Sequence, residues 1–224
     1  MTRERWMALG FAIGSTCFVI GPFPGYASLV GETADGVTFF VGSIFFTAAG
    51  AVQTSLAAPE RHGPGAGRAA WWAATIQSVG TICFNVTTYR ALHVAITAPR
   101  YNALVWRPDA VGSICFLVSG AIAYAASARR GWRPRRGGHG WWEPAVNLLG
   151  CMLFGISAIA GHVVPSSGTV LSLAAANWTT SLGAVCFLVC AIATLRTGHT
   201  SKSPRLRRVR DLEHNIARRV EGLA

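Results

Sequence analysis

The chain has 224 residues, a formal net charge of +11, only 13% charged residues and a mean hydropathy of +0.38. So few charges, combined with long apolar runs, lie outside the usual range of soluble domains and are typical of integral membrane proteins. The composition therefore excludes an ordinary soluble domain.

Six apolar segments are candidates to cross a membrane, since a helix needs about 20 predominantly apolar residues to span a hydrocarbon core of roughly 30 Å. In chain order they run from Trp6 to Gly21, Gly36 to Ala57, Trp71 to Thr88, Asp109 to Ser127, Trp142 to His162 and Asn177 to Leu195. The first is the weakest, because Gly21-Pro-Phe-Pro-Gly25 interrupts it early, and it also has features of a cleavable signal peptide. We predict an all-α, polytopic membrane helix bundle of six transmembrane helices, or of five if the first segment is removed.

The basic residues predict the orientation of these segments. Nearly all Lys and Arg lie in the N-terminus, in residues 59–70 and 128–140, and in the C-terminal tail, whereas the opposite connections carry Arg90, Arg100 and Arg107. Lys and Arg accumulate in cytoplasmic loops, so we predict a multi-pass protein of a bacterial plasma membrane with cytoplasmic N- and C-termini. The basic loops and tail are expected to bind anionic inner-leaflet lipids, and nucleic acid is not an expected partner because the sequence has no recognisable DNA-reading element.

One short motif, Gly-x-x-x-Phe, occurs once in each apolar segment. Its copies are Gly14/Phe18, Gly42/Phe46, Gly80/Phe84, Gly112/Phe116, Gly150/Phe154 and Gly183/Phe187. Helices in lipid associate through close packing, and a glycine lets a neighbouring backbone approach while the phenylalanine one turn further on fills the adjacent groove. We therefore interpret the motif as a recurring helix-packing contact rather than a ligand site.

The same motif indicates an internal repeat whose unit is a pair of helices. In the first, third and fifth segments it is preceded by a tryptophan in the pattern Trp-x7-Gly-x3-Phe, which begins at Trp6, Trp72 and Trp142. Because tryptophan favours the membrane interface, this spacing puts the glycine and the phenylalanine on either side of mid-membrane. We predict a transmembrane domain of residues 1–195 with three tandem helical hairpins, at about 6–57, 71–127 and 142–195. The full repeat in the first segment argues against its removal as a signal peptide.

The third segment carries a polar stripe on one helical face. Its members are Gln77, Thr81, Asn85 and Thr88. Lipid satisfies no hydrogen bonds, so this face must contact protein or water. We favour hydrogen bonding between helices; the alternative is a possible polar path for a solute, with Gln53 and Asn147 of other segments as partners.

The cysteines and two histidines offer a redox or metal alternative. Four thiols lie at equal depth, one residue before a motif phenylalanine, where soft ligands can bind a metal or exchange disulfides; they are Cys17, Cys83, Cys115 and Cys186. His93 and His162 share a similar depth near the outward ends of their segments, as bis-His haem ligation would require. We favour small buried fillers for the thiols and interfacial hydrogen bonding for the histidines, so no catalytic, cofactor-binding or metal-ligating residue is predicted.

Three acids at segment ends are expected to open helices. They are Asp35, Asp109 and Glu143, the last two beside Pro108 and Pro144. A carboxylate in the first turn complements the helix dipole. We therefore favour capping over a proton relay for all three, and the lack of a mid-span charge disfavours an ion-coupled pump.

The tail of residues 196–224 has a different character. Ser203-Pro204 has the form of a helix start, and beyond it apolar residues recur every three or four positions between arginines. We predict a short cytoplasmic amphipathic helix that lies on the inner leaflet or, alternatively, binds a protein partner.

Three phrases of the sequence resemble the YrhK-domain membrane proteins in their longer, six-span actinobacterial form. They are Thr38-Phe-Phe-Val-Gly-Ser-Ile-Phe-Phe46, Asn85-Val-Thr-Thr-Tyr89 and Trp106-Arg-Pro-Asp-Ala-Val-Gly-Ser-Ile-Cys-Phe116. The resemblance covers most of the chain and implies the membrane class. It implies no reaction, cofactor or transported substrate.

The leading functional hypothesis from the sequence is a non-enzymatic membrane protein, structural or interacting with lipids and partners, whose helices pack into a dry bundle. The first alternative is a small-solute transporter or channel that uses the polar stripe, and the second is a membrane redox or metal-binding protein. A water-filled path that reaches mid-membrane distinguishes the transporter, and a chromophore or bound metal distinguishes the redox protein.

Overall fold

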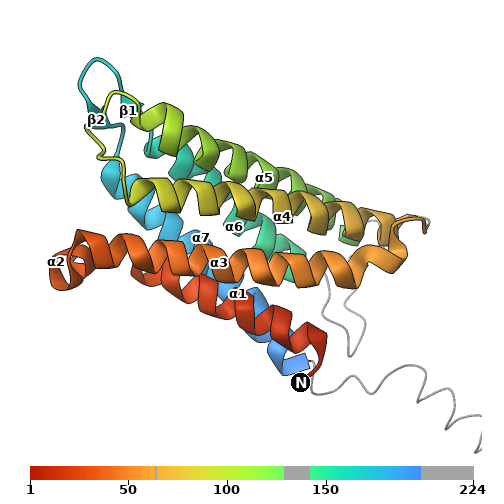
Figure 1. Cartoon of the computed structure of the whole chain (residues 1–224). Helices are drawn as coiled ribbons and strands as arrows, with labels where there is room; N and C mark the ends of the chain where they lie inside the picture. The colour runs from red at the N-terminus through yellow and green to blue at the C-terminus, as the bar shows by residue number, and fades with distance from the viewer. Residues whose placement is uncertain (64, 129–141, 198–224) are drawn as a thin grey trace, which may run out of the picture.

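The computed structural model describes residues 1–63, 65–128 and 142–197, and these residues form an all-helical bundle (Figure 1). The long helices are α1 (Arg3–Ile20), α3 (Glu32–Ala57), α4 (Ala66–Ala91), α5 (Arg107–Ala128), α6 (Trp142–Ala160) and α7 (Leu173–Thr197). The short elements are the helix α2 (Tyr26–Val30), the 3₁₀ turn η1 (Ala58–Glu60), the π-helical turn η2 (Asn102–Trp106) and the antiparallel strands β1 (Val163–Val164) and β2 (Thr169–Val170). The predicted all-α class is confirmed. The amphipathic helix predicted after Ser203 lies outside the described residues.

Four helical segments of the described chain are long and apolar enough to cross a membrane, which is consistent with the predicted membrane class. They are Glu32–Glu60, Asn102–Ala128, Trp142–Ala160 and Leu173–Arg196. Helices α1 and α4 coincide with the first and third predicted segments but are less apolar. The reason is visible in their sequences, because α1 begins with three charged residues and α4 carries the polar stripe together with Arg68 and Arg90.

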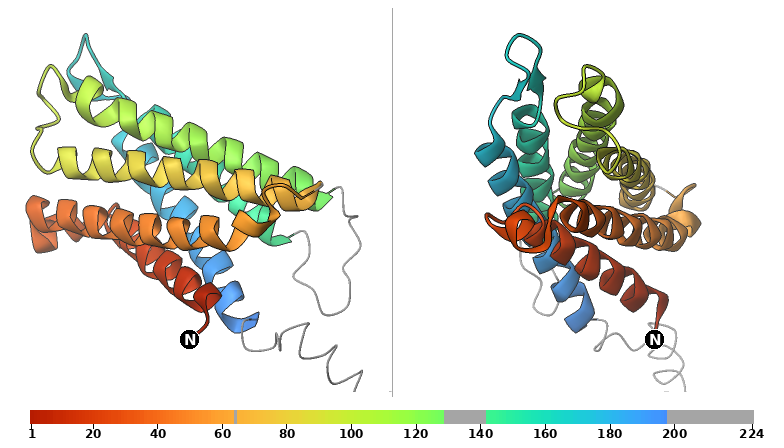
Figure 2. Two further views of the ribbon diagram at one scale, coloured as in Figure 1. Left: turned by 45° about the vertical axis from the view of Figure 1, so that its right-hand side comes forward. Right: turned by 60° about the vertical axis from the view of Figure 1, so that its left-hand side comes forward.

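The long helices pack in chain order around a common axis and close into a ring. Each packs against the next one along the chain, from α1 with α3 to α6 with α7, and α7 also packs against α1. The Ser181 hydroxyl of α7 donates a hydrogen bond of 2.9 Å to the Val19 carbonyl of α1. The first and last long helices therefore complete the ring, which Figure 2 shows from two sides.

The connections define two different ends of the bundle. The hairpin end holds α2, residues 92–101 and the β1–β2 hairpin, and the N-terminal end holds the start of the chain and η1 (Figure 1). At the hairpin end, prolines follow α1 and disfavour its continuation. Gly25 and Gly31 then adopt φ values of +90° and +89°, which glycine tolerates far better than other residues, so that the chain turns into α2 and again into α3.

The π-helical turn η2 leads directly into α5, whose second residue is Pro108. Proline has no N–H, so the Leu104 carbonyl four residues earlier lacks its usual helical donor. The Arg90 guanidinium of α4 replaces that donor at 3.2 Å, and the Thr87 hydroxyl of α4 donates to the next carbonyl, that of Val105, also at 3.2 Å. Side chains of α4 thus hold the start of α5 in place.

The turn η2 also extends the helical segment that contains Asp109 toward its N-terminus. The Arg107 N–H donates to the Asn102 carbonyl, so η2 runs into α5 without a break. Asp109 consequently lies about two turns inside a continuous helical segment that begins at Asn102. Asp109 lies in the first turn of α5, as expected, but because η2 runs into this turn it is not a free helix N-terminus.

The motif glycines bring the backbones of paired helices into contact. A Cβ atom added to Gly14 of α1 would lie 2.9 Å from the Gly42 carbonyl oxygen of α3. Between α6 and α7 the contact is reciprocal, since a Cβ on Gly150 or Gly183 would lie 3.0 Å from the other residue's carbonyl oxygen. A Cβ on Gly112 of α5 would likewise lie 3.1 Å from the carbonyl oxygen of its α4 counterpart. No larger residue fits at these crossings without displacing a backbone.

Candidate functional site

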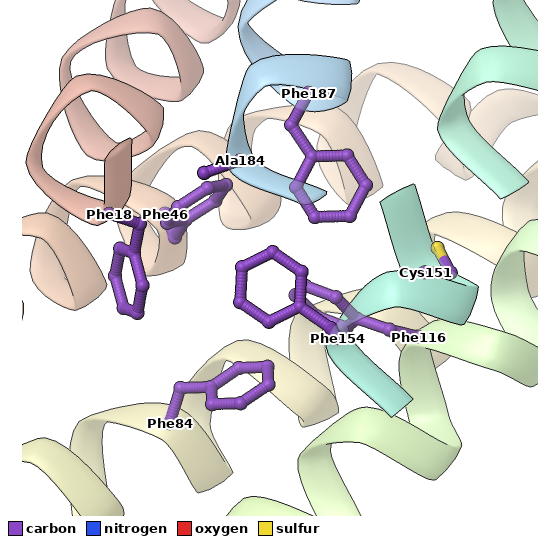
Figure 3. Close-up of a cluster of buried hydrophobic side chains, with 8 residues drawn as sticks. All are labelled: Phe18, Phe46, Phe84, Phe116, Cys151, Phe154, Ala184 and Phe187. Atoms are coloured by element: carbon purple, nitrogen blue, oxygen red, sulfur yellow. The ribbon is translucent and has the colours of Figure 1, made fainter. Parts of the chain in front are cut away.

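The six motif phenylalanines meet on the axis of the ring in one buried cluster, here called the phenylalanine plug (Figure 3). Its members are Phe18, Phe46, Phe84, Phe116, Phe154 and Phe187. Rings of one helix pair are close, with centroids 5.4 Å apart for Phe154 and Phe187, and rings of different pairs also touch, as Phe18 and Phe154 do at 6.0 Å. Even the most accessible ring, that of Phe187, is only 6% exposed. Aromatic side chains therefore fill the axis at this level.

On the hairpin-end side, the plug is the floor of a cavity of about 210 Å³, here called the hairpin-end cavity. Phe18, Phe84 and Phe154 form this floor, and residues from all the long helices line the cavity. A water molecule needs roughly 10–15 Å³ of such volume. The cavity therefore has room for several waters or for a small solute.

Several hydroxyl groups of this cavity are already hydrogen-bonded between helices. Thr88 Oγ1 of α4 lies 2.9 Å from Ser43 Oγ of α3. Ser157 Oγ of α6 lies 2.6 Å from Thr180 Oγ1 of α7. These bonds join neighbouring helices along the cavity wall, so the hydroxyls have protein partners even when no solute is bound.

Asp109 differs from these hydroxyls. Asp109 is half-buried, its side chain lines the cavity, and it has no hydrogen-bond or ion-pair partner within the described part of the chain. The phenol of Tyr101 also lines the cavity, just before the segment Asn102–Ala128, and burial together with the Asp109 charge raises the pKa of Tyr101.

The turn η2 also closes the hairpin end against α6. The Asn102 side chain accepts a hydrogen bond from the Val163 N–H at 3.1 Å and donates one to the Val163 carbonyl at 2.6 Å. The Trp106 indole N–H donates to the Ala158 carbonyl at 2.7 Å, and its ring lies edge-on to His162 with centroids 4.6 Å apart. His162 therefore forms part of a clamp between η2 and the end of α6.

On the opposite side of the plug, a second cavity of about 100 Å³ faces the N-terminal end. We call it the amide cavity, because side-chain amides from α3, α4 and α6 line it together with two plug rings: Gln53, Gln77, Asn147, Phe46 and Phe187. Gln77 Oε1 accepts a hydrogen bond from Ser119 Oγ at 3.3 Å. Gln53 Oε1 is buried without a partner among the described residues. The structure thus brings Gln53 and Asn147 to the same cavity as Gln77.

The four residues of the polar stripe reach different surroundings. Thr88 lines the hairpin-end cavity and Gln77 lines the amide cavity. Between them, Thr81 is fully buried, and Asn85 Nδ2 donates a hydrogen bond of 2.8 Å to Thr47 Oγ1 of α3. The middle of the stripe therefore joins α4 to α3, while each end of the stripe reaches one of the cavities.

The thiols and His93 take part in local packing. The Cys17 Cβ lies 2.7 Å from the position of a Cβ added to Gly42, so this cysteine packs against the glycine of the paired helix. All six cysteines are free. His93 lies edge-on to Tyr89, with ring centroids 5.0 Å apart. Within residues 1–63, 65–128 and 142–197, no three metal-ligating side chains gather in one place.

Comparisons of the chain with protein-family models, with curated proteins and with solved structures gave no match. The resemblance to YrhK-domain proteins therefore stays a prediction. The geometry of the two cavities and the plug is the basis for a functional proposal.

The sequence analysis missed the place of Asp109 in the cavity because Pro108 suggested a helix start at this point. An available signal was the apolar run of residues 103–106, which extends the helical segment toward its N-terminus. Such an extension moves Asp109 from the end of the segment to its interior. An ionisable residue in the interior of a membrane segment is a functional candidate by default.

Proposed function

We propose that this chain is a transport protein or channel that carries a small solute along the bundle axis, across a bacterial plasma membrane and without a catalytic reaction. One observation carries the proposal: a cavity lies on each side of the phenylalanine plug, and helices from around the ring line both cavities. Membrane conduits use apolar constrictions as gates and place solute sites near mid-membrane. The plug is then the closed gate, and the cavities are its two vestibules.

The proposed topology has six membrane spans in three hairpins. Four segments are apolar enough to span on their own, and α1 and α4 complete the ring between them. A polar α4 is compatible with a membrane position because the middle of its stripe bonds to α3 rather than facing lipid. The basic residues of the sequence favour a cytoplasmic N-terminal end and an extracytoplasmic hairpin end.

Opening of the conduit requires that plug rings move apart. The plug rings meet mostly edge-on or tilted. In the proposed open state a few of these side chains adopt other χ1 rotamers while the helices keep their places. Close glycine contacts beside each phenylalanine hold the helix pairs together during such a change. In this proposal the motif glycines keep the helix backbones in place, while the motif phenylalanine side chains change rotamer.

Cysteine accessibility tests the proposal directly. In a variant whose native cysteines are replaced by alanine, Thr180→Cys introduces a thiol into the hairpin-end cavity and Gln53→Cys introduces one into the amide cavity. A small, membrane-impermeant thiol reagent is expected to modify Thr180→Cys only in right-side-out vesicles and Gln53→Cys only in inverted vesicles. Modification is read by mass spectrometry.

A lipid-facing position is the matched control. Ile114 of α5 is 59% exposed on the outside of the ring, so Ile114→Cys is expected to stay unmodified in both vesicle preparations. Protection of both cavity thiols, with full reaction after denaturation, would contradict the conduit.

A structural role remains the second candidate, and the plug is the observation that favours it. The plug rings are buried and the cavity hydroxyls are bonded between helices, as in a bundle that only has to hold together. In that case the basic tail, through anionic lipid or a protein partner, carries the function. The accessibility experiment separates the two candidates, since a dry scaffold protects both cavity thiols.

A further inference from the structure

We propose that the hairpin-end cavity binds a small organic cation of the quaternary or substituted ammonium class, held by the Asp109 carboxylate and surrounding aromatic faces. The inference rests on the proposed function and names the class of solute that the conduit takes. Charge, the engagement of the other polar groups, the aromatic lining and the size of the cavity all support it.

Asp109 is the isolated acidic side chain of this cavity. Its half-buried carboxylate lines the cavity and has no hydrogen-bond or ion-pair partner among the described residues. A charge in such surroundings is costly unless a counter-charge accompanies it. The nearest cationic side chain of α4, Arg90, donates instead to the Leu104 carbonyl, where it replaces the donor that Pro108 lacks. The counter-charge for Asp109 is therefore expected to come from a ligand.

The remaining polar groups do not favour an inorganic ion. The hydroxyls of Thr88, Ser157 and Thr180 already pair between helices, and the Thr87 hydroxyl donates to a carbonyl of η2. Hard metal ions need six or more oxygen ligands, or several retained waters. One carboxylate with hydroxyls that are already engaged does not supply that set. A weakly hydrated organic cation needs only the single counter-charge.

Aromatic rings supply the rest of the site. Six aromatic side chains line the cavity: Phe18, Phe39, Phe84, Tyr101, Trp106 and Phe154. The faces of such rings attract alkylammonium groups through cation–π interaction, most strongly where water is excluded. An acid together with several aromatic rings on the wall of one cavity is the combination that recognises this class of ligand.

The cavity size limits the ligand to a small one. Its volume of about 210 Å³ lies below the roughly 300–1,000 Å³ of pockets for drug-sized molecules. Choline and tetramethylammonium are small enough to serve as probes. The neutral isostere of choline, 3,3-dimethylbutan-1-ol, has nearly the same shape and lacks the charge.

Equilibrium binding to the purified full chain in detergent tests the inference. Radiolabelled choline is expected to bind saturably and to be displaced by tetramethylammonium but not by 3,3-dimethylbutan-1-ol. Asp109→Asn, nearly isosteric and uncharged, is expected to weaken choline binding by about 30-fold or more, as loss of one partner of an enclosed ion pair does. Elution as a single species in size-exclusion chromatography checks that the variant folds.

Two further variants keep the test independent of that single change. Asp35→Asn removes an acid near the start of α3 that does not line the cavity, and it is expected to leave choline binding unchanged. Phe39→Leu removes one aromatic face, keeps the charge of the site and is expected to weaken binding by about 2- to 10-fold. If Asp109→Asn does not fold, Phe39→Leu and the neutral isostere still decide the question.

Four results would overturn the inference. They are absence of choline binding at millimolar concentration, equal displacement by the neutral isostere, equal loss of binding in Asp35→Asn and Asp109→Asn, and displacement by K⁺ or Na⁺ at concentrations below those of tetramethylammonium. If choline binds but both cavity thiols are protected in vesicles, the cation site is supported and the conduit is contradicted. If the cavity thiols are accessible but choline does not bind, the conduit is supported and the cation site is contradicted.

Discussion

The hydroxyl oxygens of Ser43 on α3 and Thr88 on α4 lie 2.9 Å apart, in a buried contact between two helices that belong to different pairs. Thr88 also lines the hairpin-end cavity, while Ser43 directly follows the motif glycine of its helix. This hydrogen bond therefore links a residue next to a motif glycine with a residue of the cavity wall. Polar contacts of this kind contribute to helix association in lipid, where the hydrophobic drive between helices is weak.

Loss of this bond is expected to lower stability modestly. Thr88→Val keeps the shape of the side chain and removes its hydroxyl, so the free energy of unfolding should fall by about 0.6 to 1.7 kcal/mol. A double-mutant cycle with Ser43→Ala, followed by unfolding in mixed micelles, measures the coupling. Additive effects of the two changes would show that the hydroxyls do not interact.

At the glycine contacts between helices, the addition of a single methyl group is expected to lower stability more than loss of the Ser43–Thr88 hydrogen bond does. Gly183→Ala adds one methyl group, which would lie 2.7 Å from a ring carbon of Phe154 and 3.0 Å from the Gly150 carbonyl oxygen. Overpacking of this kind costs about 1–3 kcal/mol, so the Tm in detergent should fall. Ala121→Val, at an exposed position of α5, adds more volume and should leave the Tm nearly unchanged. A Tm for Gly183→Ala equal to that of the native chain would mean that α6 and α7 do not pack so closely.

The plug predicts a leaky variant if the axis is a conduit. Phe154 contacts rings from several helices, and Phe154→Ala removes the ring that also lies at the floor of the hairpin-end cavity. Passive efflux of labelled choline from proteoliposomes is expected to rise about tenfold or more. A tenfold rise corresponds to a barrier to permeation that is lower by about 1.4 kcal/mol.

Phe23→Ala serves as the control for the plug variant. Phe23 lies at the hairpin end, is 56% exposed, and is not part of the plug. Its removal should leave efflux at the native level. Equal efflux from both variants and the native chain, with the protein folded, would argue that the plug does not separate two vestibules.

The clamp at the hairpin end predicts a local effect. Asn102→Ala removes both bonds to the Val163 backbone and leaves its N–H without that acceptor. An unsatisfied buried group costs roughly 1–3 kcal/mol, so hydrogen exchange in the β1–β2 hairpin should accelerate by about 5- to 100-fold. Ser167→Ala, which removes an exposed hydroxyl of the same hairpin, is the control and should change little. Unchanged exchange in Asn102→Ala would mean that the hairpin is held by other contacts.

The location of the long helices could be predicted from the sequence, because it depends on the lengths of apolar runs along the chain. Apolar run lengths located the long helices, and the fixed spacing between Trp6, Gly14 and Phe18 gave the depth of the motif. Depth along a helix follows directly from the rise per residue. In three of the six helices this spacing predicted a glycine and a phenylalanine on either side of mid-membrane; the structure gathers all six motif phenylalanines into the plug.

The arrangement around the axis could not be predicted in the same way. Which helix contacts which depends on packing between side chains of different segments, and nothing in the spacing of one segment records it. The bond from Ser181 to the Val19 carbonyl, which closes the ring, connects residues 162 positions apart. The cavities are likewise spaces between helices, and they have no sequence pattern of their own.

Asp109 illustrates a different limit. Pro108 is equally compatible with the first turn of a helix and with a helix interior in which another donor replaces its missing N–H. Arg90 is that donor here, and it belongs to a different helix. The local sequence therefore gave two acceptable positions for Asp109, and a contact across the bundle decides between them.

Closure of the ring through α1 and α7 also has a consequence for how the proposed membrane bundle would assemble. In the proposed membrane topology, the flank of α1 that receives α7 stays in contact with lipid until α7 is inserted. Until then the Val19 carbonyl lacks its partner from α7, and the bundle has an open seam along one side. If the bundle is a conduit, its path is therefore sealed from the surrounding bilayer only after α7 has been inserted.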